Sequence, residues 1–188
     1  MHRFRRILVL LGLLTLGAAT VAFAGPGRGD DDRRGHRGDR AAATLVNAEG
    51  ERVGRAWFRE RGRDGSVFVF AQVQDLPPGF HGFHIHTTGA CEPDFGAAGG
   101  HFNPAGADHG DHAGDQPTLL VMEDGTGVLA FATDRYSIDD LRDDDGSAVM
   151  VHELADNYAN IPERYGGPDE ETLATGDAGS RLACGEVR

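Results

Sequence analysis

The sequence predicts an all-β domain, an eight-stranded antiparallel Greek-key barrel or sandwich with two long functional loops. Three observations support this fold class. Short apolar runs with strand-like alternation recur through residues 41–188, without a convincing long helical pattern. Turn residues such as Gly, Pro, Asn and Asp separate these runs. Two intervals, 87–117 and 153–180, are far longer than ordinary turns, and long loops within a compact domain are usually functional.

Eight short strands are expected. They cover residues 43–47, 52–60, 66–74, 80–86, 118–122, 127–133, 147–152 and 181–187. The third is apolar on both faces for most of its length, which predicts a central position in the sheet. Residues 123–126 join the fifth and sixth strands as a hairpin turn. Residues 137–141 are expected to form one helical turn.

The N-terminus has the pattern of an export signal. Three arginines precede a mostly apolar run at 7–18, and Ala22-Phe23-Ala24 is a small-x-small cleavage motif. Residues 1–24 are therefore interpreted as a signal peptide that directs export to the periplasm, the cell envelope or the medium. The alternative is a retained membrane anchor, but the apolar run is short for a bilayer span. No stable membrane anchor is expected after cleavage.

Residues 25–40 are rich in Gly, Asp and Arg and lack apolar periodicity, so they are expected to form a disordered linker. The functional domain is then 41–188. Acidic residues outnumber basic ones by 30 to 18, for a formal charge of −12, and every basic residue other than His is Arg. This acidity argues against nucleic acid or anionic membrane as a partner. A site that uses an anion needs its own local positive field.

The chain has two cysteines, Cys91 and Cys184. In an exported protein a single disulfide is the natural interpretation, and two free buried thiols are the alternative. A disulfide here would close a loop of about 93 residues and, in the chain-entropy model, stabilise the fold by roughly 4.7 kcal/mol.

Most of the histidines lie in one part of the chain, between positions 81 and 152. His84 and His86 are two residues apart on a predicted strand, so both side chains point to the same face. Such a pair alone is a weak signal, since alternating histidines on a strand are more often a surface accident. His152 ends a distant apolar strand, where an unpaired imidazole would be costly without a role.

A denser group of ligand-type residues follows in the first long loop. Its members are His101, His109, His112 and Asp115. Three imidazoles and a carboxylate at short loop spacings suit a tetrahedral zinc site. The sequence therefore favours a metal-binding protein.

Five segments together resemble the copper/zinc superoxide dismutase family. They are Gly82-Phe83-His84-Ile85-His86, His101-Phe102-Asn103-Pro104, the run from His109 to Asp115, Val151-His152-Glu153, and the run from Gly176 to Gly185. The resemblance covers nearly all of 41–188, and five motifs in order are far more specific than any one of them. It implies copper and zinc as cofactors and the superoxide anion as a small-molecule substrate.

The resemblance also implies a role for each matching residue. The implied copper ligands are His84, His86, His101 and His152. The implied zinc ligands are His101, His109, His112 and Asp115, with His101 as an imidazolate bridge between the metals. The implied catalytic residues are His101 and Arg181, the latter beside the copper. The implied supporting residues are Asp156, which links a copper-ligand His to a zinc-ligand His, His81, which bonds backbone near the site, and the disulfide cysteines Cys91 and Cys184.

The residue types fit the implied reaction. Imidazole suits both metals. Copper would cycle between Cu(II) and Cu(I), so that one superoxide leaves as oxygen and another as hydrogen peroxide. The sequence departs from the family at several points, and two of them bear directly on the site: only two residues separate His109 from His112, and Leu173-Ala174-Thr175 stands where many members have a guiding lysine. Arg164 is the candidate to replace that lysine.

Two other function classes compete with a redox enzyme. An exported copper or zinc buffer would be favoured by loss of a copper ligand or of Arg181, and none is missing. A structural or adhesive β-domain would carry the histidines incidentally. A homodimer is compatible with the resemblance, because dimer interfaces in this family differ between lineages.

Overall fold

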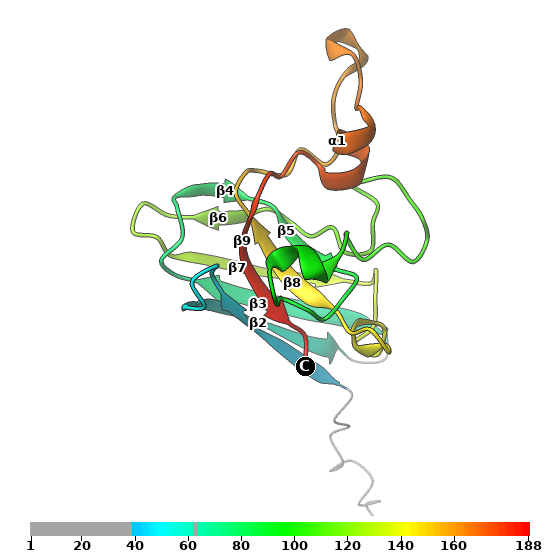
Figure 1. Cartoon of the computed structure of the whole chain (residues 1–188). Helices are drawn as coiled ribbons and strands as arrows, with labels where there is room; N and C mark the ends of the chain where they lie inside the picture. The colour runs from blue at the N-terminus through cyan, green and yellow to red at the C-terminus, as the bar shows by residue number, and fades with distance from the viewer. Residues whose placement is uncertain (1–38, 62–63) are drawn as a thin grey trace, which may run out of the picture. The chain divides into compact units, whose positions relative to one another are not determined.

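The computed structural model describes residues 39–61 and 64–188 (Figure 1). The predicted signal peptide lies outside the described residues, as does the predicted linker apart from Asp39 and Arg40. Arg40 is already part of the first strand, one residue before the predicted start of the domain. Within the described part of the chain, no helix has the length and apolar character needed to cross a membrane.

The described residues form a single antiparallel sheet of nine strands, which confirms the predicted all-β fold class. The strands are β1 Arg40–Val46, β2 Arg52–Arg61, β3 Ser66–Val73, β4 Gly79–His81, β5 Phe83–His86, β6 Leu119–Val121, β7 Gly127–Thr133, β8 Ala148–His152 and β9 Arg181–Glu186. Their order across the sheet is β4-β6-β7-β3-β2-β1-β9-β8-β5. β3 lies inside the sheet, between β2 and β7, as predicted for an apolar central strand.

The strand predicted at 80–86 is divided at Gly82, so the expected count of eight is one too low. β4 pairs with β6, whereas β5 pairs with β8 at the opposite edge of the sheet. The Gly82 N–H donates to the Leu154 carbonyl at 2.7 Å, and the Gly82 carbonyl accepts from the His152 N–H at 2.8 Å. Because one residue joins the two edge strands, the ends of the sheet come together and the barrel is nearly closed.

Strand alternation places the core on one side of β5 and the histidines on the other. Phe83 and Ile85 are fully buried within the main apolar cluster. His84 and His86 alternate with them and therefore point away from that cluster. Burying a Phe or Ile side chain contributes about 1.5–3 kcal/mol, so the core fixes the direction in which both imidazoles point.

The described loops contain four short helices. They are the 3₁₀ turns at Phe95–Ala98, Asp140–Arg142 and Glu163–Tyr165, and helix α1 at Glu170–Thr175. The helical turn predicted at 137–141 lies at Asp140–Arg142, and the Asp140 carboxylate accepts hydrogen bonds from the Ser137 N–H and hydroxyl just before it. The predicted disulfide joins Cys91, in the first long loop, to Cys184 on β9, with the Cα atoms 5.8 Å apart.

Candidate metal centre

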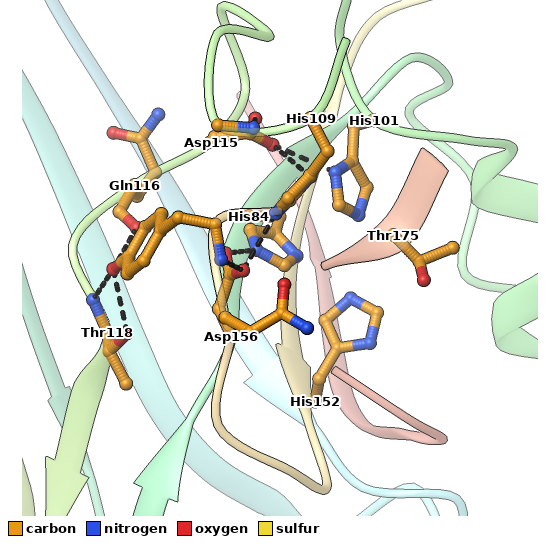
Figure 2. A network of polar contacts seen from close by, with 12 residues as sticks. His84, His101, His109, Asp115, Gln116, Thr118, His152, Asp156 and Thr175 are labelled. Carbon is orange, nitrogen blue, oxygen red and sulfur yellow. Dashed lines mark hydrogen bonds and ion pairs between the residues drawn. The ribbon is translucent and has the colours of Figure 1, made fainter. Parts of the chain in front are cut away.

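Seven buried side chains form two adjoining clusters of possible metal ligands. Figure 2 labels His84, His101, His109, Asp115 and His152 among them. The four-histidine cluster consists of His84, His86, His101 and His152. The aspartate cluster consists of His101, His109, His112 and Asp115. Within each cluster the ligand-type atoms all lie within 4.8 Å of one another. The structure thus brings together every residue that the sequence predicts as a ligand, and His101 belongs to both clusters.

The four-histidine cluster is built by β5, β8 and the first long loop. His84 and His86 pair in register with β8, which ends at His152, and an isolated bridge sets His101 beside His86. The rings of His84 and His101 have centroids 4.0 Å apart. The Nε2 atoms of His86 and His152 are 3.3 Å apart. The side chains therefore direct nitrogen atoms into a shared space.

Hydrogen bonds to the outer nitrogens orient these rings. His86 Nδ1 contacts the Gly99 carbonyl at 2.9 Å, and His152 Nδ1 contacts the Gly179 carbonyl at 3.1 Å. His84 Nε2 contacts the Asp156 carboxylate at 2.8 Å. Each ring keeps its other nitrogen for the cluster, which is the usual arrangement of histidines that bind a metal.

Burial keeps three imidazoles of the four-histidine cluster, those of His84, His86 and His152, neutral. It lowers the pKa of His84 to about 4, that of His86 to about 2 and that of His152 to about 3. The positive charges that neighbouring histidines would carry act in the same direction. Neutral imidazole is the form that binds metals.

In the aspartate cluster, one carboxylate oxygen faces three imidazoles. Asp115 Oδ1 lies 2.9 Å from His101 Nδ1, 3.2 Å from His109 Nδ1 and 3.3 Å from His112 Nδ1. Burial by itself would raise the pKa of Asp115, but the contacts with His101 and His109 outweigh it and hold the pKa well below its usual range. A carboxylate and three imidazoles form a donor set that zinc commonly takes.

Asp156 connects the two clusters, as Figure 2 shows. Its Oδ2 contacts His84 Nε2 at 2.8 Å, and its Oδ1 contacts His109 Nε2 at 2.7 Å. All three side chains are fully buried. Burial lowers the pKa of His109, but the contacts with the Asp115 and Asp156 carboxylates outweigh this and raise it to about 9. The contacts match the linking role that the resemblance implies for Asp156.

Arg181 and His81 border the four-histidine cluster. The Arg181 guanidinium donates to the Phe95 carbonyl and, at 2.6 Å, to the Gly99 carbonyl. Since Gly99 also contacts His86, one carbonyl separates the arginine from the cluster. The two ring nitrogens of His81 each lie 2.8 Å from a backbone carbonyl, one of them that of His152. Neither ring nitrogen of His81 faces the cluster.

Sequence reasoning missed Gly176 and Tyr158. A Cβ at Gly176 would lie 2.1 Å from Asp156 Oδ1 and 2.2 Å from His109 Nε2, so only glycine leaves room for that contact. The Tyr158 N–H donates to Asp156 Oδ1 at 2.7 Å. Glycine commonly follows the last residue of a helix, so the position of Gly176 directly after α1 gave no sign of its role beside Asp156 and His109. No local pattern could have identified Tyr158.

The metal-free protein is expected to lose stability below pH 6.5. His84, His86 and His152 have pKa values below the ordinary 6.5 in the fold, so the unfolded chain takes up protons first as the pH falls. Between pH 6.5 and 5 this favours unfolding by up to about 2 kcal/mol per imidazole. Urea midpoints of the metal-free protein at the two pH values would measure the loss.

His109 acts in the opposite direction. Its pKa is raised to about 9, so the stability that it contributes is present below pH 6.5 and is lost as the pH rises through 9.

The control for the predicted loss of stability in acid is the variant His86→Gln. Its urea midpoint should fall less between pH 6.5 and 5 than that of the wild type. Equal wild-type midpoints at pH 6.5 and 5 would contradict the prediction.

Comparisons with known proteins agree with this geometry. Residues 52–187 match the family model described as copper/zinc superoxide dismutase. The superoxide dismutase (Cu-Zn) of Mycobacterium tuberculosis is 40% identical over 164 residues, which cover 77% of this chain and 68% of that protein. The corresponding enzyme of Mycolicibacterium paratuberculosis is 45% identical over 162 residues, covering 76% of this chain and 71% of the relative.

Solved structures show the same fold. The clock protein EA4 is 31% identical, with a TM-score of 0.67, and the match covers 81% of this chain and 95% of that one. A SOD-like protein from Bacillus subtilis is 35% identical, with a TM-score of 0.63, covering 77% and 96%. The span of the family model contains every residue of both clusters.

Proposed function

The chain belongs to the copper/zinc superoxide dismutase family, and we propose that it disproportionates superoxide with copper in the four-histidine cluster and zinc in the aspartate cluster. In this reaction two superoxide anions and two protons give one oxygen and one hydrogen peroxide. One anion gives up an electron and the other takes it. Copper, when bound, supplies the one-electron change between Cu(II) and Cu(I) that separates these two steps.

The observation that carries the proposal is a pair of buried nitrogens that face the two clusters without a hydrogen bond. Within the described residues, His84 Nδ1 and His109 Nδ1 make no hydrogen bond, although His109 Nδ1 lies 3.2 Å from Asp115 Oδ1. Leaving a buried polar atom unpaired costs about 1–3 kcal/mol, which a metal–nitrogen bond at each position would offset. One nitrogen belongs to each cluster, and the opposite nitrogens of both rings are held by Asp156. The residues present therefore suit two metals.

His101 is the residue proposed to move a proton. Its Nδ1 lies among the nitrogens of the aspartate cluster, 3.3 Å from His112 Nδ1, which leaves Nε2 for the four-histidine cluster. We propose that Nε2 takes up a proton after the first superoxide has reacted and gives it to the peroxide formed from the second. The aspartate cluster would hold the ring in place through Nδ1 meanwhile.

Arg181 is the residue proposed to hold the anion. The protein is strongly acidic, so its overall field repels superoxide. Helix α1 contains the Leu173–Thr175 stretch, where many family members have a guiding lysine, and adds Glu170 and Glu171 just before it. The guanidinium, fixed by two backbone carbonyls, supplies a local positive charge next to His86. Arg164 is a further candidate for steering, although its guanidinium is stacked 4.8 Å from the ring of Tyr165.

Arg181→Ile is expected to slow turnover about fivefold without loss of copper. The side chain is part-exposed, so the lost stabilisation of the anion is about 1 kcal/mol. Arg181→Lys should recover much of the rate, since a point charge still attracts the anion. Steady-state superoxide assays with measured copper content would test this. Added salt should slow the wild type more than Arg181→Ile, and full activity of Arg181→Ile at normal copper content would exclude the guiding role.

One purified sample tests the proposed function as a whole. Elemental analysis should find copper and zinc in similar amounts, and a superoxide assay should find turnover that chelation abolishes. Bound metals without turnover would identify a metal buffer instead. No bound metal after supplementation would leave only a structural β-domain.

The proposal includes export of the protein, with residues 1–24 as a cleaved signal. The Cys91–Cys184 disulfide supports this, since such bonds persist in oxidising compartments. The N-terminal sequence of the protein recovered from cell envelope and medium would test it. Sedimentation of the same material would show whether it is a homodimer.

A further inference from the structure

Arg135 reaches from just beyond β7 to the two-residue link between His109 and His112. Its Nη1 donates to the Gly110 carbonyl at 3.1 Å and to the His112 carbonyl at 2.9 Å. Its Nη2 is also 3.8 Å from the Asp111 carboxylate, an exposed pair that contributes little by itself. One guanidinium thus holds the carbonyl side of the link.

The amide side of the same link is held by Asp115. Its Oδ2 accepts from the Gly110 N–H at 2.7 Å and from the His112 N–H at 3.1 Å. Asp115 is therefore oriented with Oδ1 toward the imidazoles. The two residues that Asp115 binds through their amides are those that Arg135 binds through their carbonyls.

The link also packs closely against the second long loop. Gly110 has φ +93, and a Cβ there would lie 2.8 Å from the Tyr158 carbonyl oxygen. So short a link has few conformations in which both flanking imidazoles reach one point. Loss of a group that holds its peptides should therefore change the direction of those rings.

We propose that Arg135 is a positioning residue for the zinc site. It holds Gly110 and His112 so that the imidazoles of His109 and His112 converge, and it thereby increases the affinity for zinc. The inference rests on the zinc site of the proposed function. It concerns Arg135 alone, which contacts no ring nitrogen of the cluster.

A positioning role and a purely electrostatic role of Arg135 predict opposite changes in zinc affinity when its guanidinium is removed. A guanidinium near the site repels a dication, so a purely electrostatic role means that its removal tightens zinc binding. A positioning role means that its removal weakens zinc binding. Removing an outer partner of a metal ligand typically costs about 10- to 100-fold in metal affinity.

The experiment measures zinc affinity of the metal-free full-length protein by competition with a chromophoric chelator. Arg135→Gln should bind zinc about 10- to 100-fold more weakly than the wild type. Arg135→Lys should recover only part of this, since an ammonium lacks the planar fork. Arg59→Gln, which removes the same charge from the exposed side of β2, is the matched control and should bind zinc like the wild type. Cobalt(II) in place of zinc should show a less tetrahedral absorption spectrum in Arg135→Gln.

The possible results separate the two proposals. Zinc affinity of Arg135→Gln equal to or tighter than wild type overturns the positioning role, as does lower stability of the metal-free variant with unchanged zinc affinity. If Arg135→Gln fails to fold, unchanged affinity and cobalt spectrum in Arg135→Lys overturn it equally. A wild type that binds no zinc overturns the proposed zinc site and, with it, this inference.

Discussion

Replacing His152 by alanine is expected to remove copper and nearly all superoxide dismutase activity. The change deletes one of four imidazoles from the four-histidine cluster. Loss of an outer partner already costs about 10- to 100-fold, so loss of a ligand should cost more than about 100-fold. The backbone of His152 still bonds to Gly82, and β8 stays paired with β9, so the fold should remain. Copper content, activity and circular dichroism of one preparation would measure these effects.

His81→Gln is the control for this experiment. His81 is another buried histidine next to the cluster, but both its ring nitrogens face backbone carbonyls. Its replacement should lower stability while copper remains bound. Near wild-type copper content and activity in His152→Ala would exclude the copper assignment.

Loss of the disulfide is expected to have the largest effect on stability. The chain-entropy model gives roughly 4.7 kcal/mol for a loop of this size, a large part of the stability of an ordinary domain. Chemical denaturation of Cys91→Ala/Cys184→Ala against the oxidised wild type would measure the loss. Reduced wild type, which keeps both sulfur atoms but lacks the bond, is the control for the loss of these atoms in the alanine variant. If a thiol reagent labelled both cysteines completely in native protein without reductant, the Cys91–Cys184 pairing would be contradicted.

The same bond should also affect activity. Cys91 begins the segment that leads to Gly99, whose carbonyl contacts both His86 and Arg181. Without the bond to Cys184, this segment is held to β9 by the hydrogen bonds of Arg181 and by the packing of Phe95 and Ala98 in an apolar cluster with Cys184. Activity of the reduced protein should therefore fall before its secondary structure is lost.

Local spacing predicted the part of the site that depends on strand geometry. His84 and His86 share a face because side chains alternate along any strand. The same alternation continues through Gly82, which is why the division into β4 and β5 was not predicted. The change of partner at Gly82 depends on contacts with residues 152–154, which no local pattern contains.

The residue types that bind metals could be recognised in the sequence, but the residues that position them could not. His101, His109, His112 and Asp115 are close enough in the chain for their chemistry to predict a joint site. Arg135 acts through two backbone carbonyls, and any surface arginine would look the same in the sequence. Its contribution depends only on where β7 ends in the folded protein.

The segment that carries the aspartate cluster also covers an edge of the sheet that no described strand pairs with. β5 is the last strand in the sheet order, and on its free side Ile85 exchanges backbone hydrogen bonds with Phe102 and Gly114 at 2.8 and 2.9 Å. Unpaired edge strands are templates for pairing with other chains and so for aggregation. The residues that surround the proposed zinc site therefore also protect the protein against edge-to-edge association.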